Sequence, residues 1–450
     1  MKIWKPVSKY LYVLVFLIII YIILGIAVSA IPNKLISENS KKSSEYLIEN
    51  KETPDVIERN TSYKREYIFN YTNALMLNTA FSIDESKPLE SFLIDRNNYI
   101  PNITEILNED TQYGLPNNSY YQNQVEAYYN LTHKDRGSTV KESYEYARYW
   151  HGYLVILRPA LVFFNYANIE KISMVCFVIL LIICIILMWK KVDKMSAFLF
   201  FLSFIAMNIF YSAKSINEIA CFIIMLISSI YILLRHEKTE HMPLIFIIIG
   251  SITNFFDLLT LPLITFAIPA CIYFLMNAKD ERGNLKESMI LFINFALAWV
   301  LGYGITWIVK WVLVDLICNR NVTDIALKQV IYRMGLSAGS KDFNYGYVLS
   351  ENKKYLGNQV IYFVAIVSVA IMGAGIIRNR NTRLKINPSE FIIYLIIAVL
   401  PFIWYFVLKN HSVVYARYTH RLMLISIYSL WIFLAKIWGF DKEDRIKSYK

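Results

Sequence analysis

Cationic and aromatic side chains are concentrated in the segment Tyr146–Pro159. Arg148, His151 and Arg158 follow one another at steps of three and seven residues, with aromatic residues among them. If the segment is helical, the three cations lie near one face, where they could bind a phosphate or pyrophosphate. Arginine and aromatic residues also form the interfacial belt that anchors many membrane proteins, and that alternative stays open.

A second cationic segment, Lys409–Arg421, lies between two apolar runs near the C-terminus. It contains His411, Arg417, His420 and Arg421, and the last three fall on one face of a helix. Short loops on the outer side of a membrane normally avoid such a density of cations. The segment therefore predicts contact with a ligand. The alternative is pairing with acids of the long polar segment near the N-terminus.

Three carboxylates are candidates for acid–base chemistry. Asp257 lies in a turn between two short apolar runs, and an ionisable residue at membrane depth is a candidate functional residue. Glu45 and Asp84 belong to the polar segment that follows the first apolar run. A general base must lie within hydrogen-bonding reach of the hydroxyl that it deprotonates. The alternatives are a turn or capping role for Asp257 and a surface position for the other two.

Several common catalytic motifs are missing from the sequence. It contains no Gly-rich phosphate-binding loop, HExxH, GxSxG or CxxC, which argues against ATP-driven and metalloprotease mechanisms, and no metal site is predicted. Many of the basic residues behind the net charge of +11 lie beside apolar runs, so nucleic-acid binding is not predicted. Four of the five cysteines lie within apolar runs, and only Cys318 falls in an expected outer loop. No disulfide framework is expected.

Apolar runs must position these residues. The sequence is 56% hydrophobic with a mean hydropathy of +0.39, above the roughly 45–50% apolar content of a soluble domain. We predict an all-α integral membrane protein with about ten transmembrane helices, each of roughly 17–25 predominantly apolar residues. The expected spans are Leu11–Ala30, Ile172–Trp189, Ser196–Ala213, Ile219–Leu234, Pro243–Phe256, Leu261–Met276, Met289–Leu313, Asn358–Ile377, Phe391–Leu408 and Leu422–Trp438.

The spans divide the chain into three parts. Residues 1–30 form an N-terminal anchor, residues 31–171 a large extracytoplasmic helical segment, and residues 172–450 a polytopic transmembrane domain. Lys and Arg follow alternate spans, which places both termini in the cytoplasm of a multi-pass protein of the cell membrane. Within the extracytoplasmic segment, the apolar periodicity predicts amphipathic helices at Ser43–Ile57, Tyr67–Ala80 and Lys141–Val155.

The layout of the chain resembles that of the C-superfamily (GT-C) of membrane glycosyltransferases: one span, then a long outer segment, then many spans with short loops. The segments Arg148–Pro159, Asn254–Pro262 and Asn410–Arg421 are also similar to uncharacterised multi-pass membrane proteins of Gram-positive bacteria. The GT-C resemblance implies transfer of a sugar from a polyprenyl-phosphate-linked donor to a cell-envelope acceptor at the outer membrane face. In that family an acidic pair usually follows the first span, whereas Ile31–Lys42 contains only Glu38.

The resemblance gives the candidate residues expected roles. Basic residues hold the lipid phosphate, and a carboxylate accepts the proton of the acceptor hydroxyl. The phosphate ligands are then Arg148, His151, Arg158, His411, Arg417, His420 and Arg421, and the acid–base candidates are Asp257, Asp84 and Glu45. The partners are the donor and membrane lipids. No organic cofactor is implied, while a divalent metal stays open.

Two other functions fit the same layout. One is a flippase for lipid-linked oligosaccharides or a polysaccharide exporter, and the other is a non-catalytic envelope assembly protein. A flippase would need cations across the whole membrane, whereas the candidate ligand cations here lie in loops on one side.

Overall fold

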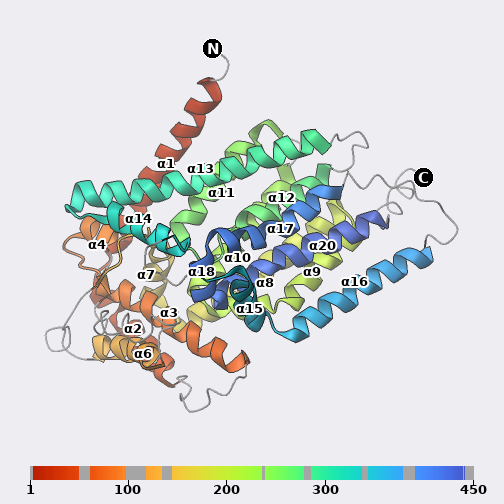
Figure 1. The fold of residues 1–450 in the computed structure, drawn as a ribbon. Coiled ribbons are helices and arrows are strands. Elements are labelled where there is room, and N and C mark those ends of the chain that lie inside the picture. The colour runs from red at the N-terminus through yellow and green to blue at the C-terminus, as the bar shows by residue number, and fades with distance from the viewer. Residues whose placement is uncertain are drawn as a thin grey trace.

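The computed structural model is almost entirely helical (Figure 1). Within the part of the chain that it describes, the only strands are the antiparallel two-residue pair β1 (Arg96–Asn97) and β2 (Tyr144–Glu145). Six of the described helices are long and apolar enough to cross a bilayer. The prediction of an all-α membrane protein is therefore confirmed. The described residues are 4–49, 61–94, 96–97, 118–133, 144–235, 239–277, 285–336, 343–378, 391–438 and 440.

Each predicted span corresponds to a helix in the structure. The six helical stretches that qualify by length and composition are Ser8–Ser29, Tyr166–Lys191, Ile216–Arg235, Leu285–Cys318, Asn358–Ile377 and Ala416–Ile437. The full helices for all ten are α1 (Trp4–Ser29), α8 (Tyr166–Lys191), α9 (Lys194–Ala206), α10 (Ile216–Arg235), α11 (Met242–Phe256), α12 (Ile264–Asn277), α13 (Leu285–Cys318), α16 (Asn358–Arg378), α17 (Ile392–Val407) and α20 (Met423–Ile437).

Five of these helices are short, among them α20, whose 15 residues reach spanning length only together with the helical turns that precede it from Ala416. Helices α9, α11, α12 and α17 have 13, 15, 14 and 16 residues. At 1.5 Å per residue, a helix of 14 residues is about 21 Å long, less than the roughly 30 Å of a hydrocarbon core. A count of about ten spans therefore stays a prediction.

Helices α11 and α13 approach each other more closely than ordinary side chains allow. A Cβ atom at Gly250 would lie 2.2 Å from the Trp299 carbonyl oxygen, and one at Gly302 would lie 2.1 Å from the Ile247 carbonyl oxygen. Small residues at such a contact let two helix backbones pack directly in a membrane protein. This close contact packs the middle of α11 directly against the middle of α13.

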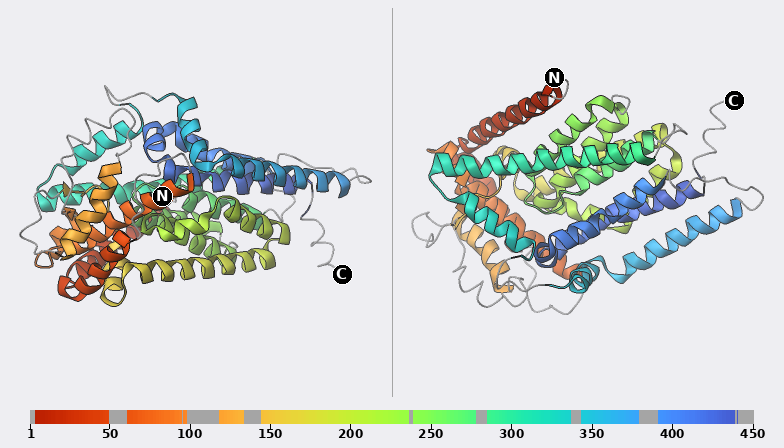
Figure 2. Two further views of the ribbon diagram at one scale, coloured as in Figure 1. Left: turned by 90° about the horizontal axis from the view of Figure 1, so that it is seen from below. Right: turned by 45° about the horizontal axis from the view of Figure 1, so that its top comes forward.

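The residues after α1 form a second helical layer with its own core. It consists of α2 (Asn33–Glu49), α3 (Thr61–Ser82), α4 (Pro88–Ile94), α6 (Asn118–His133) and α7 (Leu154–Phe163). Buried apolar residues from four of these helices, among them Ile36, Leu77, Tyr128 and Leu157, pack together. The layer lies beyond one end of the long helices (Figures 1 and 2). We call it the outer layer. Its location outside the cytoplasm stays a prediction.

The three predicted amphipathic helices have different outcomes. Tyr67–Ala80 lies within α3, and the first half of Ser43–Ile57 lies within α2, while residues 50–57 fall outside the described part. The helix at Lys141–Val155 is wrong for its described residues, which form β2 and turns until α7 begins at Leu154. Tertiary contacts hold this segment in place of a helix, since Gly152 N–H donates to the Phe255 carbonyl oxygen (2.8 Å).

Short helices lie between the longer helices along the chain. They are α14 (Val322–Arg333), α15 (Tyr345–Leu356), α18 (Lys409–Val414), α19 (Ala416–Thr419) and the single-turn helices η1 (Ile209–Lys214), η2 (Thr239–His241) and η4 (His420–Leu422). Of these, α14, α15 and α18 lie near the end of the bundle that faces the outer layer (Figure 1). The hydroxyls of Thr72 in α3 and Tyr418 in α19 are hydrogen-bonded across the junction (2.6 Å).

Candidate functional site

The two cationic segments of the sequence meet in the structure. The Arg148 guanidinium lies 4.9 Å from the centre of the Tyr146 ring, and the Arg333 guanidinium lies 5.4 Å from that of Tyr415. Burial raises the pKa of the Tyr149 phenol, and the charges of Arg333 and Arg148 oppose this shift. Both arginines are therefore close enough to act on one phenol. We use the name cationic cluster for Arg148, Arg333, His411 and Arg417 with Tyr146, Tyr149, Tyr415 and Tyr418.

Arg333 and His411 form the centre of the cationic cluster. Arg333 Nη1 lies 2.7 Å from His411 Nδ1, and because a guanidinium only donates, Nδ1 accepts and the imidazole is neutral. Burial lowers the pKa of His411 well below its usual value, and the charge of Arg333 lowers it further. The carbonyl of Leu259, a residue with φ of +64°, acts in the opposite direction. His411 therefore lies between Arg333 and the loop after α11.

Arg417 approaches the same aromatic rings from α19. Its guanidinium lies 4.9 Å from the centre of the Tyr418 ring and 5.9 Å from that of Tyr415. A cation over a buried aromatic face is stabilised by the ring quadrupole. Tyr415 thus lies within cation–π distance of both Arg333 and Arg417.

Asp257 is the buried carboxylate on the neighbouring loop, and it is 1% exposed. Its Oδ1 accepts from the Thr260 N–H (2.9 Å), the Thr260 hydroxyl and the Cys221 thiol (3.4 Å). Its Oδ2 accepts from the Tyr303 hydroxyl at 3.4 Å. Oδ1 thus performs the turn role foreseen from the sequence, whereas Oδ2 has the weaker contact.

The charge of Asp257 reaches the cationic cluster. Burial raises the pKa of the Asp257 carboxyl, with the Thr260 hydrogen bonds opposing the shift. The Asp257 charge also raises the pKa of Tyr149, the phenol on which Arg333 and Arg148 act. One proton-accepting group and several cations therefore lie within electrostatic reach of the same ring.

Two tryptophans of α13 fix the loop that carries Arg148. The Arg148 carbonyl oxygen accepts from Trp307 Nε1 (2.7 Å) and Trp311 Nε1 (3.0 Å). Trp150 Nε1 donates to the Thr306 carbonyl oxygen (2.9 Å). Indole N–H groups usually find an acceptor when they are buried, and here the acceptors are backbone atoms. These three hydrogen bonds therefore hold the loop against the C-terminal half of α13.

His151 supports this loop from within. Its φ is +52°, and its Nε2–H donates to the Tyr146 carbonyl oxygen (2.9 Å). Its Nδ1 lies 3.2 Å from the Tyr153 hydroxyl. The ring packs edge-on against Tyr146 and Tyr149. His151 therefore orients the phenols of the cationic cluster, and direct phosphate contact by its imidazole stays a prediction.

Arg158 does not share a helix face with Arg148, because the intervening segment is not helical. Its buried guanidinium donates to the carbonyl oxygens of Val28 (2.8 Å), Ile31 and Ala80, and to Asn33 Oδ1 (3.2 Å). These contacts tie α7 to the end of α1, the start of α2 and the end of α3. The structure thus gives Arg158 a structural position.

Arg421 and His420 have intramolecular partners as well. Arg421 Nη1 donates to Glu218 Oε1 (2.8 Å), and both side chains are buried. An acidic partner was the alternative expected from the sequence, although Glu218 belongs to α10 and not to the polar segment. His420 Nδ1–H donates to the Ala416 carbonyl oxygen (3.0 Å), and its ring stacks on Tyr355.

Glu45 and Asp84 lie in the outer layer. Glu45 Oε1 is 3.0 Å from His133 Nε2, and Asp84 Oδ1 accepts from the N–H (3.0 Å) and hydroxyl (2.6 Å) of Ser86. Their described contacts are thus with the outer layer itself. Among the described residues, no group of three or more His, Cys, Asp or Glu side chains is placed to hold a metal ion.

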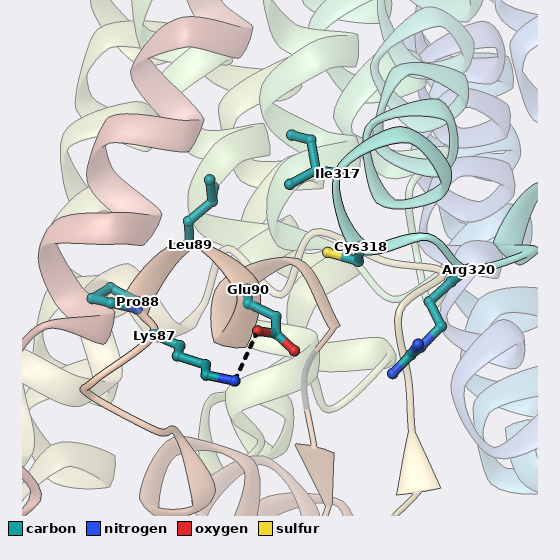
Figure 3. A pocket seen from close by; sticks show the side chains of 7 residues that line it. All are labelled: Lys87, Pro88, Leu89, Glu90, Ile317, Cys318 and Arg320. Atoms are coloured by element: carbon teal, nitrogen blue, oxygen red, sulfur yellow. Dashed lines mark ion pairs between the residues drawn. The ribbon is translucent and has the colours of Figure 1, made fainter.

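A separate hollow of about 460 Å³ lies between α4 and the end of α13 (Figure 3). Its charged groups are already neutralised, since Lys87 pairs with Glu90 (3.6 Å) and Arg320 binds both oxygens of Glu145 (2.9 and 3.0 Å). The rest of its lining is Pro88, Leu89, Ile317 and Cys318. The hollow lacks the excess of positive charge found in the cationic cluster.

Comparisons with protein-family models, curated proteins and solved structures find no match to this chain.

One residue of the cationic cluster, Arg333, was not singled out from the sequence. A signal for it exists. Val322, Ala326 and Arg333 are the buried residues of α14, and steps of four and seven place them on one helical face. An arginine on the apolar face of an amphipathic helix is a candidate for a buried functional cation.

Proposed function

We propose that this protein is a membrane glycosyltransferase that uses a polyprenyl-phosphate-linked sugar. The observation that carries the proposal is the geometry of the cationic cluster, in which Arg148 lies over the Tyr146 ring and Arg333 over the Tyr415 ring. Tyr146 packs against Tyr149 (5.4 Å between ring centres), and the buried Asp257 lies on the neighbouring loop. Cations stabilise the negative charge that develops on a departing phosphate, and a carboxylate accepts the proton of an attacking hydroxyl. A cluster of cations beside a buried base supports both halves of such a transfer.

The proposed step balances as a single displacement. The oxygen of the acceptor hydroxyl attacks the anomeric carbon while the bond from that carbon to the phosphate oxygen breaks. The electron pair of that bond leaves with the polyprenyl phosphate, where Arg333, Arg148 and Arg417 stabilise it. The hydroxyl proton moves to Asp257, whose raised pKa suits a base that must hold a proton during the reaction.

The position of the site supports a lipid-linked donor. The cationic cluster lies where the bundle meets the outer layer, at one end of the long helices (Figure 1). A polyprenyl tail could remain in the bilayer while its phosphate reaches that end. We place the site at the extracytoplasmic face of the cell membrane, with both termini in the cytoplasm, as the distribution of Lys and Arg predicts.

The test is transfer by the purified protein. Detergent-solubilised protein is incubated with decaprenyl-phosphate-linked sugars and a panel of envelope glycan acceptors, and products are detected by mass spectrometry. We expect a glycosylated acceptor and free decaprenyl phosphate. A flippase or an assembly protein makes no product in detergent, so absence of turnover across the panel with folded protein would overturn the proposal.

A further inference from the structure

Asn254 has a buried amide that faces the Tyr303 phenol and makes no hydrogen bond of normal geometry with the described residues. It lies in the last turn of α11, three residues before Asp257, and is 1% exposed. Both Oδ1 and Nδ2 lack such a bond among those residues. Buried amides that make no hydrogen bond are rare, and each one requires an explanation.

A second buried asparagine, Asn352, has an amide with a structural role and serves as a comparison for Asn254. Asn352 in α15 is 4% exposed. Its Nδ2 donates to the carbonyl oxygens of Val348 (3.0 Å) and Ser412 (2.9 Å), and its Oδ1 accepts from the Thr419 hydroxyl (2.7 Å). Removing such a residue leaves its partners unsatisfied, whereas an apolar replacement of Asn254 would remove two unsatisfied atoms.

The surroundings of Asn254 indicate the kind of ligand. The Tyr303 hydroxyl donates to Asp257 Oδ2 (3.4 Å), so amide, phenol and carboxylate lie in sequence. The Tyr303 ring is stacked on Trp299 (5.1 Å between centres), and the Tyr149 ring on Trp307 (5.6 Å). The Asn254 amide can both donate and accept hydrogen bonds, and aromatic rings lie next to it. This combination suits a ligand ring that carries neighbouring hydroxyl groups.

We propose that Asn254 is a specificity-determining residue that hydrogen-bonds hydroxyls of the sugar on the donor. The inference rests on the proposed function, because it assigns to Asn254 the glycosyl group of the donor whose phosphate the cationic cluster would bind. A site built to hydrogen-bond a hydroxyl loses affinity strongly when the matching group is missing. Asn254 thus selects the sugar, while the cationic cluster binds the phosphate that every donor shares.

The test compares Asn254→Leu with Asn352→Leu in the full-length protein. Melting temperatures are measured in detergent, and affinities are measured for decaprenyl phosphate and for decaprenyl phosphate carrying hexose, N-acetylhexosamine or pentose. We expect N254L to melt at or above the wild-type temperature, whereas N352L melts lower. We expect N254L to bind decaprenyl phosphate within about twofold of wild type and to lose at least about tenfold in affinity for the preferred glycosylated donor.

The outcomes separate this inference from the proposed function. If N254L melts as low as N352L, the amide is structural and the inference is overturned. Undiminished binding of every glycosylated donor by N254L overturns it as well, with the phosphate site intact. If the wild-type protein binds neither decaprenyl phosphate nor any glycosylated form, the proposed function fails first, and the sugar assignment fails with it.

Discussion

Positive charge is buried in two regions of the molecule, and its partners differ between them. At the junction of α1, α3 and α7, Arg158 donates to three backbone carbonyls and an amide oxygen. Lys310 of α13 similarly donates to the carbonyl oxygens of Leu93 (2.8 Å) and Phe92 (3.3 Å) at the end of α4. Carbonyl groups at helix C-termini carry partial negative charge, so these cations are compensated by the fold itself.

Arg333 in the cationic cluster has weaker partners for its charge. The described partners of Arg333 are the neutral imidazole of His411 and the ring of Tyr415, and no carboxylate of the described residues contacts it. An aromatic face or an imidazole offsets less of the desolvation cost than a set of carbonyls. Arg158 and Lys310 therefore hold helices together through backbone carbonyls. In the proposed function, Arg333 would gain a stronger partner when an anion binds.

Replacing Arg158 by leucine is expected to have the largest effect on the fold. Four acceptors would lose their donor, at roughly 1–3 kcal/mol each. We expect R158L to lose more than about 4 kcal/mol of stability and to fail to yield monodisperse protein in detergent. Size-exclusion profiles and thermal melts measure this, with R158K as an intermediate that keeps the charge. An R158L protein as stable as the wild type would show that the carbonyl-bonded arginine is dispensable.

Asp257→Asn is expected to remove most of the transfer rate without unfolding the protein. The amide keeps an acceptor for Thr260, but it cannot take a proton, so we expect a loss of about 10²–10⁴-fold. Burial raises the pKa of Asp257. The wild-type rate should therefore rise as the pH increases through that raised pKa, because the carboxyl must lose its proton to act as a base. The residual rate of D257N should show no such rise.

The matched control for Asp257 is Asp193, a buried carboxylate that contacts Lys436 near the end of α20. Asp193 pairs with Lys436 (3.1 Å) and caps α9 through Ser196. Asp193→Asn is expected to lower the melting temperature while leaving the rate per folded molecule unchanged. An equal loss of rate in both variants would indicate a general effect of buried charge on the bundle, and Asp257 would lose its assigned role.

The sequence predicts most of the helices because apolar runs of spanning length have few other outcomes. It also singled out Arg148, Arg417 and Asp257, whose residue types are costly in a membrane protein. It failed for Lys141–Val155, where the described part is held by contacts to distant residues such as Phe255 and Thr306. Local periodicity contains no information about such long-range partners.

The lack of long-range information in the sequence also explains why Arg148 and Arg158 have the same expected role. Arg148 and Arg158 have equal chemical character in the sequence, and only the fold shows that backbone carbonyls surround one of them. Which carbonyls lack a partner depends on where helices end and how they meet. A cation's structural or functional role is therefore decided by distant backbone atoms, which residue spacing does not specify.

Arg333→Gln is expected to weaken binding of decaprenyl phosphate by about 10–100-fold, since hydrogen bonds to charged groups contribute roughly 1.5–3 kcal/mol. Glutamine can still donate to His411, so we expect little change in melting temperature. The control is Arg320→Gln, which removes an exposed guanidinium that binds Glu145 beside the hollow in Figure 3. Equal losses in both variants would attribute the effect to net charge and not to the cationic cluster.

The smallest effect is expected for the carboxylates of the outer layer. Both ring nitrogens of His133 face acceptors, since Nδ1 lies 2.9 Å from the Tyr129 carbonyl oxygen and Nε2 lies 3.0 Å from Glu45 Oε1. This pair joins α2 to α6, but Glu45 is 42% exposed, so Glu45→Gln should cost at most about 1 kcal/mol of stability. Its transfer rate should stay within about twofold of wild type, because the carboxylate only links two helices.

Asp84→Asn, which alters a turn, should behave in the same way. A large loss of rate in either variant, with melting temperature maintained, would move the base from Asp257 to the outer layer and reverse the contrast between the two regions.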